Sequence, residues 1–275
     1  MTDRYAVFGN PIAHSKSPLI HTAFAEQTRQ DLVYERQLVE PNKFVETARQ
    51  FFASGGSGLN ITVPFKLEAF ELADVLSERA EAAGAVNTLK KMPDGKVYGD
   101  NTDGAGLLRD ITQNLAWIIR GKRVLLLGAG GAVRGVIAPL LAEQPSRVVI
   151  ANRTLEKAEA LVKDFSVGKS AQEIKLLRAS SLQIHARPFD IIINGTSASL
   201  QGAMPDLDPA ILNPNACCYD MMYGTELTPF LQWAQRNDAQ VADGLGMLVE
   251  QAAESFYLWR GVRPETKAVM EKLRA

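Results

Sequence analysis

The feature that most constrains this 275-residue chain is an apolar run that passes directly into a glycine-rich turn. Residues 123–127 (Arg-Val-Leu-Leu-Leu) precede the turn 128–132 (Gly-Ala-Gly-Gly-Ala), and apolar residues then recur at helical spacing. An uninterrupted apolar run is typical of a strand covered on both faces. Unpaired N–H groups and the dipole at a helix start attract a pyrophosphate, which glycine allows to approach closely. We therefore predict a dinucleotide-binding unit rather than a glycine turn with a purely structural role.

The end of the next predicted strand indicates which dinucleotide binds. NAD sites usually place Asp or Glu about 20 residues after the glycine turn, where it accepts a hydrogen bond from the ribose 2′-hydroxyl. This chain has Asn152-Arg153-Thr154 there, without a carboxylate. Arg153 can pair with a 2′-phosphate and Thr154 can donate to it, which favours NADP. Thr154 also suits the N-cap of the following helix, and it can serve both purposes.

Short apolar strands alternate with amphipathic helices along most of the chain, which predicts a parallel α/β architecture. We expect two α/β lobes, with the boundary between residues 101 and 107. Strands are expected at residues 5–8, 32–39, 59–63, 85–90, 96–98, 123–127, 148–150, 191–193 and about 218–219. Helices are expected after Ser17, with Leu19, Ile20, Ala23 and Phe24 buried, and at about 44–52, 67–83, 133–141, 155–165, 244–259 and 264–273.

Charge and cysteine content exclude several classes of protein. The chain has 30 Lys and Arg against 31 Asp and Glu, so its net charge of −1 gives no long-range attraction to nucleic acid or anionic lipid. No stretch has the pattern of a signal peptide or the length of a membrane helix. Cys217 and Cys218 are adjacent and cannot form a disulfide framework, so a cytoplasmic location is expected. His14, His21 and His185 lack metal-ligand spacing, so no metal is expected.

Polar side chains recur where strands of the first lobe end, in residues 10–17, 60–66, 84–88 and 99–104. In an open parallel sheet, ligands bind beyond the carboxyl ends of the strands. Each residue also has a structural explanation: Ser17 or Asp103 as a helix cap, Asn87 as a turn residue, Lys66 as a solvated helix start. Their joint recurrence favours a site for a small polyhydroxylated substrate.

On these motifs, the chain closely resembles the shikimate dehydrogenase family, NADP-dependent enzymes of aromatic amino-acid biosynthesis. The resemblance covers essentially the whole chain. It rests on blocks in the same order: Ser15-x-Ser17, residues 60–66, 84–88 and 101–104, the glycine turn, residues 152–154, residues 219–224 (Tyr-Asp-Met-Met-Tyr-Gly) and residues 243–251. Several such blocks are far more specific than one nucleotide-binding fingerprint.

The resemblance implies a fold and a set of site residues. An N-terminal α/β substrate-binding and catalytic domain (1–102) and a Rossmann-like NADP domain (103–239) would be separated by a cleft, with C-terminal helices (240–275) returning to the first domain. Lys66 and Asp103 would be the catalytic pair and also contact the substrate. The hydroxyls and carboxylate of shikimate would be bound by Ser15, Ser17, Thr62, Asn87, Tyr223 and Gln251. NADP would contact Gly128, Ala129, Gly130, Gly131, Ala132, Asn152, Arg153, Thr154, Leu155, Glu156, Lys157, Met221 and Gly244. Glu78 lies where some members have a cofactor-side contact, although an exposed helix carboxylate explains it equally well.

Two segments depart from the family pattern. Residues 225–229 (Thr-Glu-Leu-Thr-Pro) stand where relatives more often have a basic, glycine-containing stretch, near the expected nicotinamide position. Gly195 stands where alanine is common. Neither departure changes Lys66 or Asp103.

The implied reaction is the reversible reduction of 3-dehydroshikimate to shikimate by NADPH. Negative charge that grows on the carbonyl oxygen needs a positioned proton donor, which a lysine ammonium beside a carboxylate can supply. Whether Lys66 acts alone or shares the proton with Asp103 stays open. The alternatives are an enzyme that also accepts quinate or NAD, and a non-catalytic NADP-binding regulatory module. A folate-linked two-lobe dehydrogenase would leave the Ser15 and Ser17 pair unexplained. The expected partner is the small substrate, with the chain a monomer or a homodimer.

Overall fold

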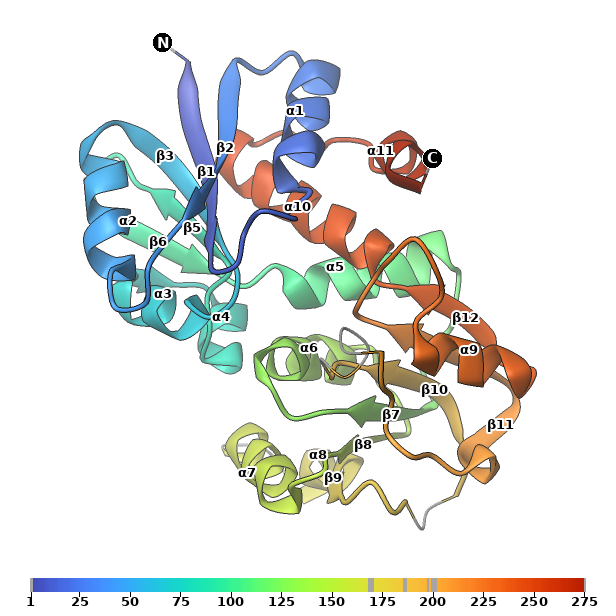
Figure 1. Cartoon of the computed structure of the whole chain (residues 1–275). Helices are drawn as coiled ribbons and strands as arrows, with labels where there is room; N and C mark the ends of the chain where they lie inside the picture. Colours follow the sequence, from blue (N-terminus) through green and yellow to red (C-terminus); the bar gives the residue numbers. More distant parts are fainter. Residues whose placement is uncertain (1, 168–170, 185–186, 197, 199–201, 275) are drawn as a thin grey trace. The chain divides into compact units, whose positions relative to one another are not determined.

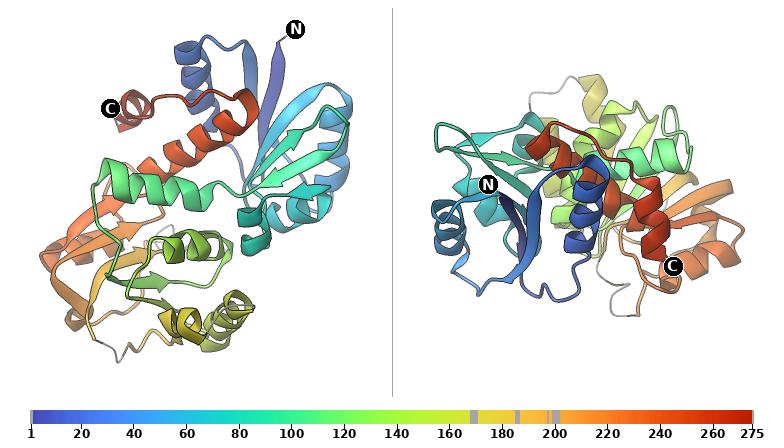
Figure 2. Two further views of the ribbon diagram at one scale, coloured as in Figure 1. Left: turned by 180° about the vertical axis from the view of Figure 1, so that it is seen from behind. Right: turned by 90° about the horizontal axis from the view of Figure 1, so that it is seen from above.

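The computed structural model describes residues 2–167, 171–184, 187–196, 198 and 202–274, so His185 lies outside the described residues. The chain divides into two compact units, Met1–Gly106 with Leu248–Ala275, and Leu107–Met247. Each unit has a six-stranded sheet with helices on both faces (Figure 1 and Figure 2). The predicted α/β fold with two lobes is confirmed.

The sheet of the first unit is mixed, in the order β2-β1-β3-β5-β6-β4. Its strands are β1 (Asp3–Gly9), β2 (Leu32–Leu38), β3 (Gly56–Ile61), β4 (Val75–Leu76), β5 (Thr88–Lys91) and β6 (Val97–Asp100). β1 pairs in parallel with β2 and β3, but β5 is antiparallel to both β3 and β6. The expectation of parallel strands is wrong for β5, because the tight turn at Gly95 can only join it to β6 as an antiparallel neighbour. Strand β6 pairs in parallel with β4.

Alternation along β1 builds a core on each face of this sheet. Ala6 and Phe8 pack with Phe44 and Phe51 of α2 (Phe44–Ala53), whereas Tyr5 stacks on Trp259 of α10 (Leu245–Arg260) with ring centroids 4.6 Å apart. The other helices of the unit are α1 (Ser17–Thr28), α3 (Lys66–Leu72), α4 (Glu78–Ala83) and α11 (Lys267–Arg274). The carboxyl end of β1 is therefore held from both sides.

The sheet of the second unit is entirely parallel and runs β12-β11-β10-β7-β8-β9. This is the doubly wound strand order of a Rossmann fold, with β7 as its first strand. The strands are β7 (Arg123–Leu127), β8 (Arg147–Ala151), β9 (Leu177–Ser180), β10 (Phe189–Asn194), β11 (Leu212–Asp220) and β12 (Gln240–Asp243). The helices are α5 (Asp103–Arg109), which enters the unit, α6 (Gly131–Ala142), α7 (Leu155–Ser166), α8 (Ala171–Leu176) and α9 (Pro229–Arg236), with a π-turn at Asp110–Asn114 and a 3-10 turn at Pro209–Ile211.

Strand β7 is covered on both faces, as its apolar run predicts. Val124 and Leu126 pack in the cluster that includes Val136 of α6, and Leu125 packs in the cluster that includes Phe230 of α9. Helix α6 runs through Pro139. The strand therefore ends in a rigid position, and the glycine turn follows from it.

The helical region expected at about residues 67–83 is helical at both ends but interrupted in the middle. The chain forms α3, then the short strand β4, then α4. Asp74 N donates to Val97 O at 2.8 Å, and Ser77 Oγ caps α4 by accepting from Ala80 N at 3.1 Å. Backbone pairing with β6 and a serine cap therefore outweigh the helical propensity of this stretch.

The start of α1 also differs from the expectation. Lys16, not Ser17, is at the N-cap, and Ser17 is the first helical residue. Leu19 is 64% exposed, whereas Ile20 and Phe24 are buried and Ala23 is half-buried. The predicted apolar stripe therefore includes one residue that faces solvent.

Several short elements are absent from the sequence-based assignment, namely β4, β9, β12, α5, α8 and α9. Strands β9 (Leu-Arg-Ala-Ser) and β12 (Gln-Val-Ala-Asp) contain few apolar residues because they lie at the two edges of their sheet. Helix α9 begins at Pro229, the last residue of the unusual segment 225–229. Thr228 caps α9 by accepting from Leu231 N, and its hydroxyl donates to Asp220 Oδ2 at 2.6 Å. Part of this departure therefore has a local structural role.

Candidate active site

Two oppositely charged side chains meet in the first unit. Lys66 is the first residue of α3 and Asp103 is the first residue of α5. Lys66 Nζ lies 2.6 Å from Asp103 Oδ2, and the side chains are 21% and 11% exposed. A pair that is nearly but not fully buried keeps access to a ligand while the surrounding protein limits screening by water.

Local hydrogen bonds place both members of this pair. Val86 N donates to Lys66 O at 3.0 Å, which ties the start of α3 to the segment before β5. Asn101 Nδ2 donates to Ala85 O at 3.0 Å, and Asn101 Oδ1 accepts from Asp103 N at 3.2 Å. The two segments that carry the pair are therefore held by the same stretch of chain.

Asn87 holds the second oxygen of the carboxylate. Its Nδ2 donates to Asp103 Oδ1 at 2.8 Å, and its Oδ1 accepts from Thr102 N at 2.9 Å. Because the backbone N–H of Thr102 can only donate, it fixes which side of the carboxamide faces Asp103. Asp103 thus has a cation on one oxygen and an amide donor on the other.

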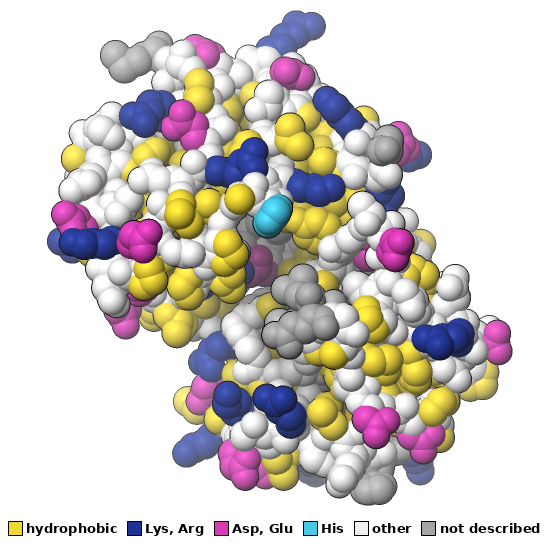
Figure 3. All heavy atoms as spheres, in the orientation of Figure 1, with side chains coloured by type: hydrophobic (Ala, Val, Ile, Leu, Met, Phe, Trp, Pro, Cys, Tyr) yellow, Lys and Arg dark blue, Asp and Glu magenta, His cyan; other side chains and the backbone are white. Residues whose placement is uncertain are grey.

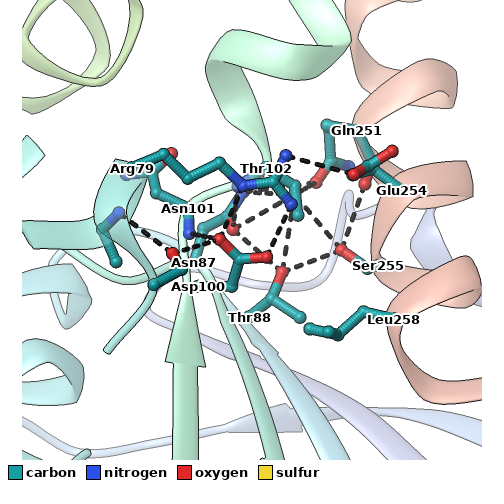
Figure 4. A network of polar contacts seen from close by, with 12 residues as sticks. Arg79, Asn87, Thr88, Asp100, Asn101, Thr102, Gln251, Glu254, Ser255 and Leu258 are labelled. Atoms are coloured by element: carbon teal, nitrogen blue, oxygen red, sulfur yellow. Dashed lines mark hydrogen bonds and ion pairs between the residues drawn. The ribbon is translucent and has the colours of Figure 1, made fainter. Parts of the chain in front are cut away.

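Gln251 of α10 lies next to this group (Figure 4). Its Nε2 donates to Leu248 O at 2.9 Å, and its Oε1 lies 3.4 Å from both Asn87 Nδ2 and Thr102 Oγ1. The structure therefore brings four of the predicted residues together: Lys66, Asn87, Asp103 and Gln251.

The two predicted serines form a separate pair. Ser15 Oγ lies 3.2 Å from Ser17 Oγ and accepts from Ser17 N at 3.3 Å, with Ser17 buried and Ser15 half-buried. Thr62 is half-buried just after β3, where its N–H donates to Phe8 O at 2.9 Å. Among the described residues, no direct hydrogen bond joins these three side chains to the group formed by Lys66, Asn87, Asp103 and Gln251.

An ion-pair network beneath the site has no counterpart in the predicted residue set. Arg79 forms two hydrogen bonds of 2.6 Å to the carboxylate of Asp100 and one of 3.1 Å to Glu254 (Figure 4). Burial alone would raise the pKa of Asp100, but the Arg79 guanidinium holds that pKa below its ordinary value. Asp100 Oδ1 also accepts from Asn101 N at 2.7 Å, so the network supports the turn that leads to Asp103. No local motif could reveal it, because Arg79 and Glu254 are 175 residues apart.

The glycine turn of the second unit has the conformation that a phosphate site requires. Gly128 has φ +104°, which favours glycine, whereas a Cβ added at Gly130 or Gly131 would meet nothing within 4 Å. The protein's own packing therefore does not require glycine at 130 and 131. The open space suits a pyrophosphate at the start of α6.

The turn after β8 leaves its polar side chains available. Arg153 and Thr154 are exposed, and Asn152 Nδ2 donates to Thr154 O at 2.8 Å. Thr154 occupies the N-cap position of α7, but its side chain makes no capping hydrogen bond, so capping does not account for it. Lys and Arg side chains gather on the part of this unit that carries α6 and α7 (Figure 3). The residues present therefore fit a 2′-phosphate.

The remaining predicted residues follow β11 or lie in α4. Gly244 N donates to Met222 O at 3.0 Å, which joins the end of β12 to the segment of Met221 and Tyr223. Burial raises the pKa of Tyr223. Glu78 is exposed in the first turn of α4.

The unusual Gly195 has a steric explanation. A Cβ at this position would lie 2.5 Å from Val133 Cγ2 and 3.0 Å from Met221 Sδ. Glycine therefore lets the end of β10 lie against α6 and the segment of Met221.

Two other kinds of feature are absent from the described residues. No helix among them has the length and apolar character needed to cross a membrane. Within the same residues, no group of three or more His, Cys, Asp and Glu side chains could hold a metal ion.

Comparisons with known families cover most of the chain. The shikimate dehydrogenase substrate binding domain matches residues 7–89, the shikimate/quinate 5-dehydrogenase family matches residues 110–202, and the shikimate 5′-dehydrogenase C-terminal domain matches residues 244–274. A shikimate dehydrogenase (NADP(+)) of Cellvibrio japonicus is 62% identical, covering 100% of this chain and 98% of that protein.

Solved structures are similar along the full length. The crystal structure of an Ael1 enzyme from Pseudomonas putida has a TM-score of 0.93 at 50% identity, covering 100% of this chain and 99% of that one. The structure of shikimate 5-dehydrogenase from Thermus thermophilus in complex with NADP(H) and shikimate has a TM-score of 0.87 at 31% identity, covering 99% of each chain.

Proposed function

This chain belongs to the shikimate dehydrogenase family and is an NADP-dependent oxidoreductase, and we propose that Lys66 and Asp103 are the acid–base pair of its reaction. The reaction is the reversible NADPH-dependent reduction of 3-dehydroshikimate to shikimate. The observation that supports the assignment of the pair is the 2.6 Å contact between Lys66 Nζ and Asp103 Oδ2.

In the reductive direction, NADPH supplies the hydride and the protein must neutralise the charge that grows on the carbonyl oxygen. Lys66 is proposed to donate the proton from Nζ to that oxygen. Asp103 orients the ammonium through Oδ2, and Asn87 keeps the carboxylate from rotating through its 2.8 Å bond to Oδ1. In the oxidative direction the same amine, once neutral, accepts the proton of the substrate hydroxyl.

The substrate ligands are proposed from two clusters and two further residues, Thr62 and Tyr223. Ser15 and Ser17 form one cluster, and Asn87 and Gln251 lie beside the acid–base pair in the other. Thr62 lies at the end of β3, four residues before Lys66. Tyr223, in the second unit, is proposed on the family resemblance alone. Together these groups offer hydroxyl and amide partners for the hydroxyls and carboxylate of shikimate.

The NADP ligands are proposed in the second unit. The open glycines of residues 128–132 would hold the pyrophosphate, and residues 152–157 would hold the 2′-phosphate, with Arg153 as the cation. Met221 and Gly244 complete the proposed set. The exposed Glu78 is either a cofactor-side contact or a helix carboxylate without a role in binding. A cytoplasmic location is proposed from the reduced pair Cys217 and Cys218.

A spectrophotometric assay with four substrate pairs tests this function. Shikimate and quinate are each offered with NADP+ and with NAD+, and reduced cofactor is followed by absorbance. We expect the highest kcat/KM for shikimate with NADP+, because residues 152–154 carry a cation and no carboxylate. If quinate is oxidised as fast as shikimate, or if NAD+ supports the same rate as NADP+, the chain is an enzyme that also accepts quinate or NAD. If the protein binds NADP without turnover, it is a regulatory module.

A further inference from the structure

Four buried polar side chains lie beside the proposed site, and none has a role assigned from the sequence, although three of them lie in the polar segments 60–66, 84–88 and 99–104. Asn60 of β3 is 6% exposed, and Thr88 of β5, Thr102 before α5 and Ser255 of α10 are all 0% exposed. Buried polar groups cost free energy unless they find partners, so the partners of each side chain indicate its role. The side chains of Thr88, Thr102 and Ser255 contact one another (Figure 4), and Asn60 Nδ2 donates to both Thr88 and Ser255.

Ser255 is the junction of this cluster. Its Oγ lies 2.8 Å from Thr88 Oγ1, 3.0 Å from Asn60 Nδ2 and 3.2 Å from Thr102 Oγ1. It also lies 3.1 Å from the carbonyl oxygen of Gln251 on its own helix. One hydroxyl thereby connects α10 to two strands and to the segment before Asp103.

A chain of polar contacts leads from Ser255 through Thr88 and Asn87 to Asp103. Thr88 Oγ1 donates to Asn87 Oδ1 at 2.9 Å. The same Thr88 hydroxyl lies 2.8 Å from Ser255 Oγ, so it links Ser255 to Asn87. Asn87 Oδ1 accepts from Thr88 Oγ1 and from Thr102 N, and both contacts keep Nδ2 turned towards Asp103.

The same serine also fixes a substrate ligand. Ser255 and Gln251 are four residues apart in α10, so they lie on one face of the helix. Anchoring the turn at Ser255 keeps Gln251 Oε1 within 3.4 Å of Asn87 Nδ2. The orientation of Asn87 and the position of Gln251 thus have a common support.

We infer that Ser255 is a positioning residue that orients Asn87 through Thr88 and sets the place of Gln251, and thereby determines how tightly shikimate binds. The inference rests on the proposed function. It assigns to Ser255 no contact with the substrate or with Lys66. Removal of the Ser255 hydroxyl should therefore raise the KM for shikimate more than it lowers kcat. Part of this rise should depend on the hydroxyl of Thr88.

Steady-state kinetics of Ser255→Ala, Thr88→Val and the double variant test this inference. Alanine favours helix and removes a single oxygen from α10, so Ser255→Ala should fold. We expect the KM for shikimate to rise about 3- to 10-fold, the size of one lost hydrogen bond, with the KM for NADP+ unchanged. Because both residues share the contact that leads to Asn87, the KM of the double variant should rise by less than the product of the two single effects.

Thr28→Ala is the matched control. Thr28 Oγ1 donates to Phe24 O at 2.6 Å, the same helix-internal bond that Ser255 makes, but it lies outside the cluster. Its kinetics should equal the wild type. Three results would each overturn the inference. The KM for shikimate could be unchanged in Ser255→Ala, or Thr28→Ala could change it as much as Ser255→Ala does. The rise in KM of the double variant could also equal the product of the rises in the two single variants.

A crystal structure of Ser255→Ala separates this inference from the proposed function. It can be read even if the wild-type protein does not turn over shikimate. We expect a displaced Gln251 or a rotated Asn87 carboxamide. Unchanged positions of both would overturn the inference, whereas absence of wild-type turnover overturns only the function.

Discussion

At the residue scale, the proposed chemistry depends on which groups face one carboxylate. Asp103 receives Lys66 on one oxygen and Asn87 on the other, so neither contact can be lost without freeing the side chain to rotate. The sequence predicts the residue types and their positions after strand ends. It does not predict that Asn87 bridges Thr102 and Asp103, because that depends on how the antiparallel pair β5 and β6 brings residues 87 and 100 together.

His21 provides a residue-scale test of burial. Its ring is buried, stacks on Tyr34 with centroids 4.2 Å apart, and burial lowers its pKa to about 3. The unfolded chain, with an ordinary histidine pKa of about 6.5, therefore binds more protons than the folded chain between these values. We expect the free energy of unfolding to decrease as pH falls from 6.5 towards 3, by up to about 1.4 kcal/mol per pH unit from this group.

Urea unfolding at several pH values measures this contribution. His21→Phe keeps an aromatic ring in the stack and should reduce the pH slope. His14→Gln changes an exposed histidine and should leave the slope unchanged. Equal slopes in the wild type and in His21→Phe would contradict the prediction.

Gly195 gives a second residue-scale prediction, about packing. In Gly195→Ala the new methyl group would meet Val133 Cγ2 at 2.5 Å, so the protein should lose about 1–3 kcal/mol of stability. Adding Val133→Ala should recover part of that loss, because it removes the colliding methyl group. Thermal unfolding that is unchanged by Gly195→Ala would show that the site can accommodate alanine without cost.

At the element scale, local patterns predict local structure well. The run 123–127, the glycine turn and helix α6 are contiguous, so their strand–turn–helix geometry follows from hydrophobic period and glycine placement. The split of residues 67–83 into α3, β4 and α4 is not predictable in this way. It depends on Asp74 N pairing with Val97, 23 residues later in the chain.

The turn between β8 and α7 carries an element-scale prediction. The exposed Arg153 precedes α7 and has no competing carboxylate in residues 152–154. Arg153→Ser should raise the KM for NADP+ about tenfold or more, since a charge-assisted contact with the 2′-phosphate is lost, and leave the KM for NAD+ nearly unchanged. Arg178→Ser, which removes an exposed arginine from β9, serves as the control. Equal effects on both cofactors would contradict the assignment.

At the scale of the whole molecule, contacts between distant parts of the chain complete the first unit. Residues from Leu248 onward join residues before 106, and Arg79 binds both Asp100 and Glu254. Burial raises the pKa of Glu254, but Arg263 and Arg79 together lower it below its ordinary value. Neither this network nor Ser255 could be found from one sequence, because their partners come together only in the folded unit.

Arg79→Met tests this long-range network. It leaves Asp100 buried without its cation, so we expect a loss of about 3–5 kcal/mol of stability at pH 7. Asp100 has a lowered pKa, so its ion pair contributes fully above the ordinary carboxyl pKa and is lost as pH falls through the lowered value. The difference from the wild type should therefore persist from pH 7 to about pH 4 and shrink below that.

The exposed pair Lys43 and Glu46, with side chains 64% and 58% exposed, gives the control for this network. Lys43→Ala should change stability by less than about 0.5 kcal/mol. Chemical denaturation at pH 7, and at a series of values below about pH 4, compares the three proteins. An Arg79→Met variant as stable as Lys43→Ala would mean that the network does not support the unit.

The central claim is that Lys66 transfers the proton, and the kcat of Lys66→Ala for shikimate oxidation with NADP+ tests it most directly. Lys96→Ala, which removes an exposed lysine from the same unit, is measured beside it. We expect kcat of Lys66→Ala to fall by about 10²-fold or more with a smaller change in KM, while Lys96→Ala keeps wild-type kcat. A kcat near the wild-type value in folded Lys66→Ala would contradict the account.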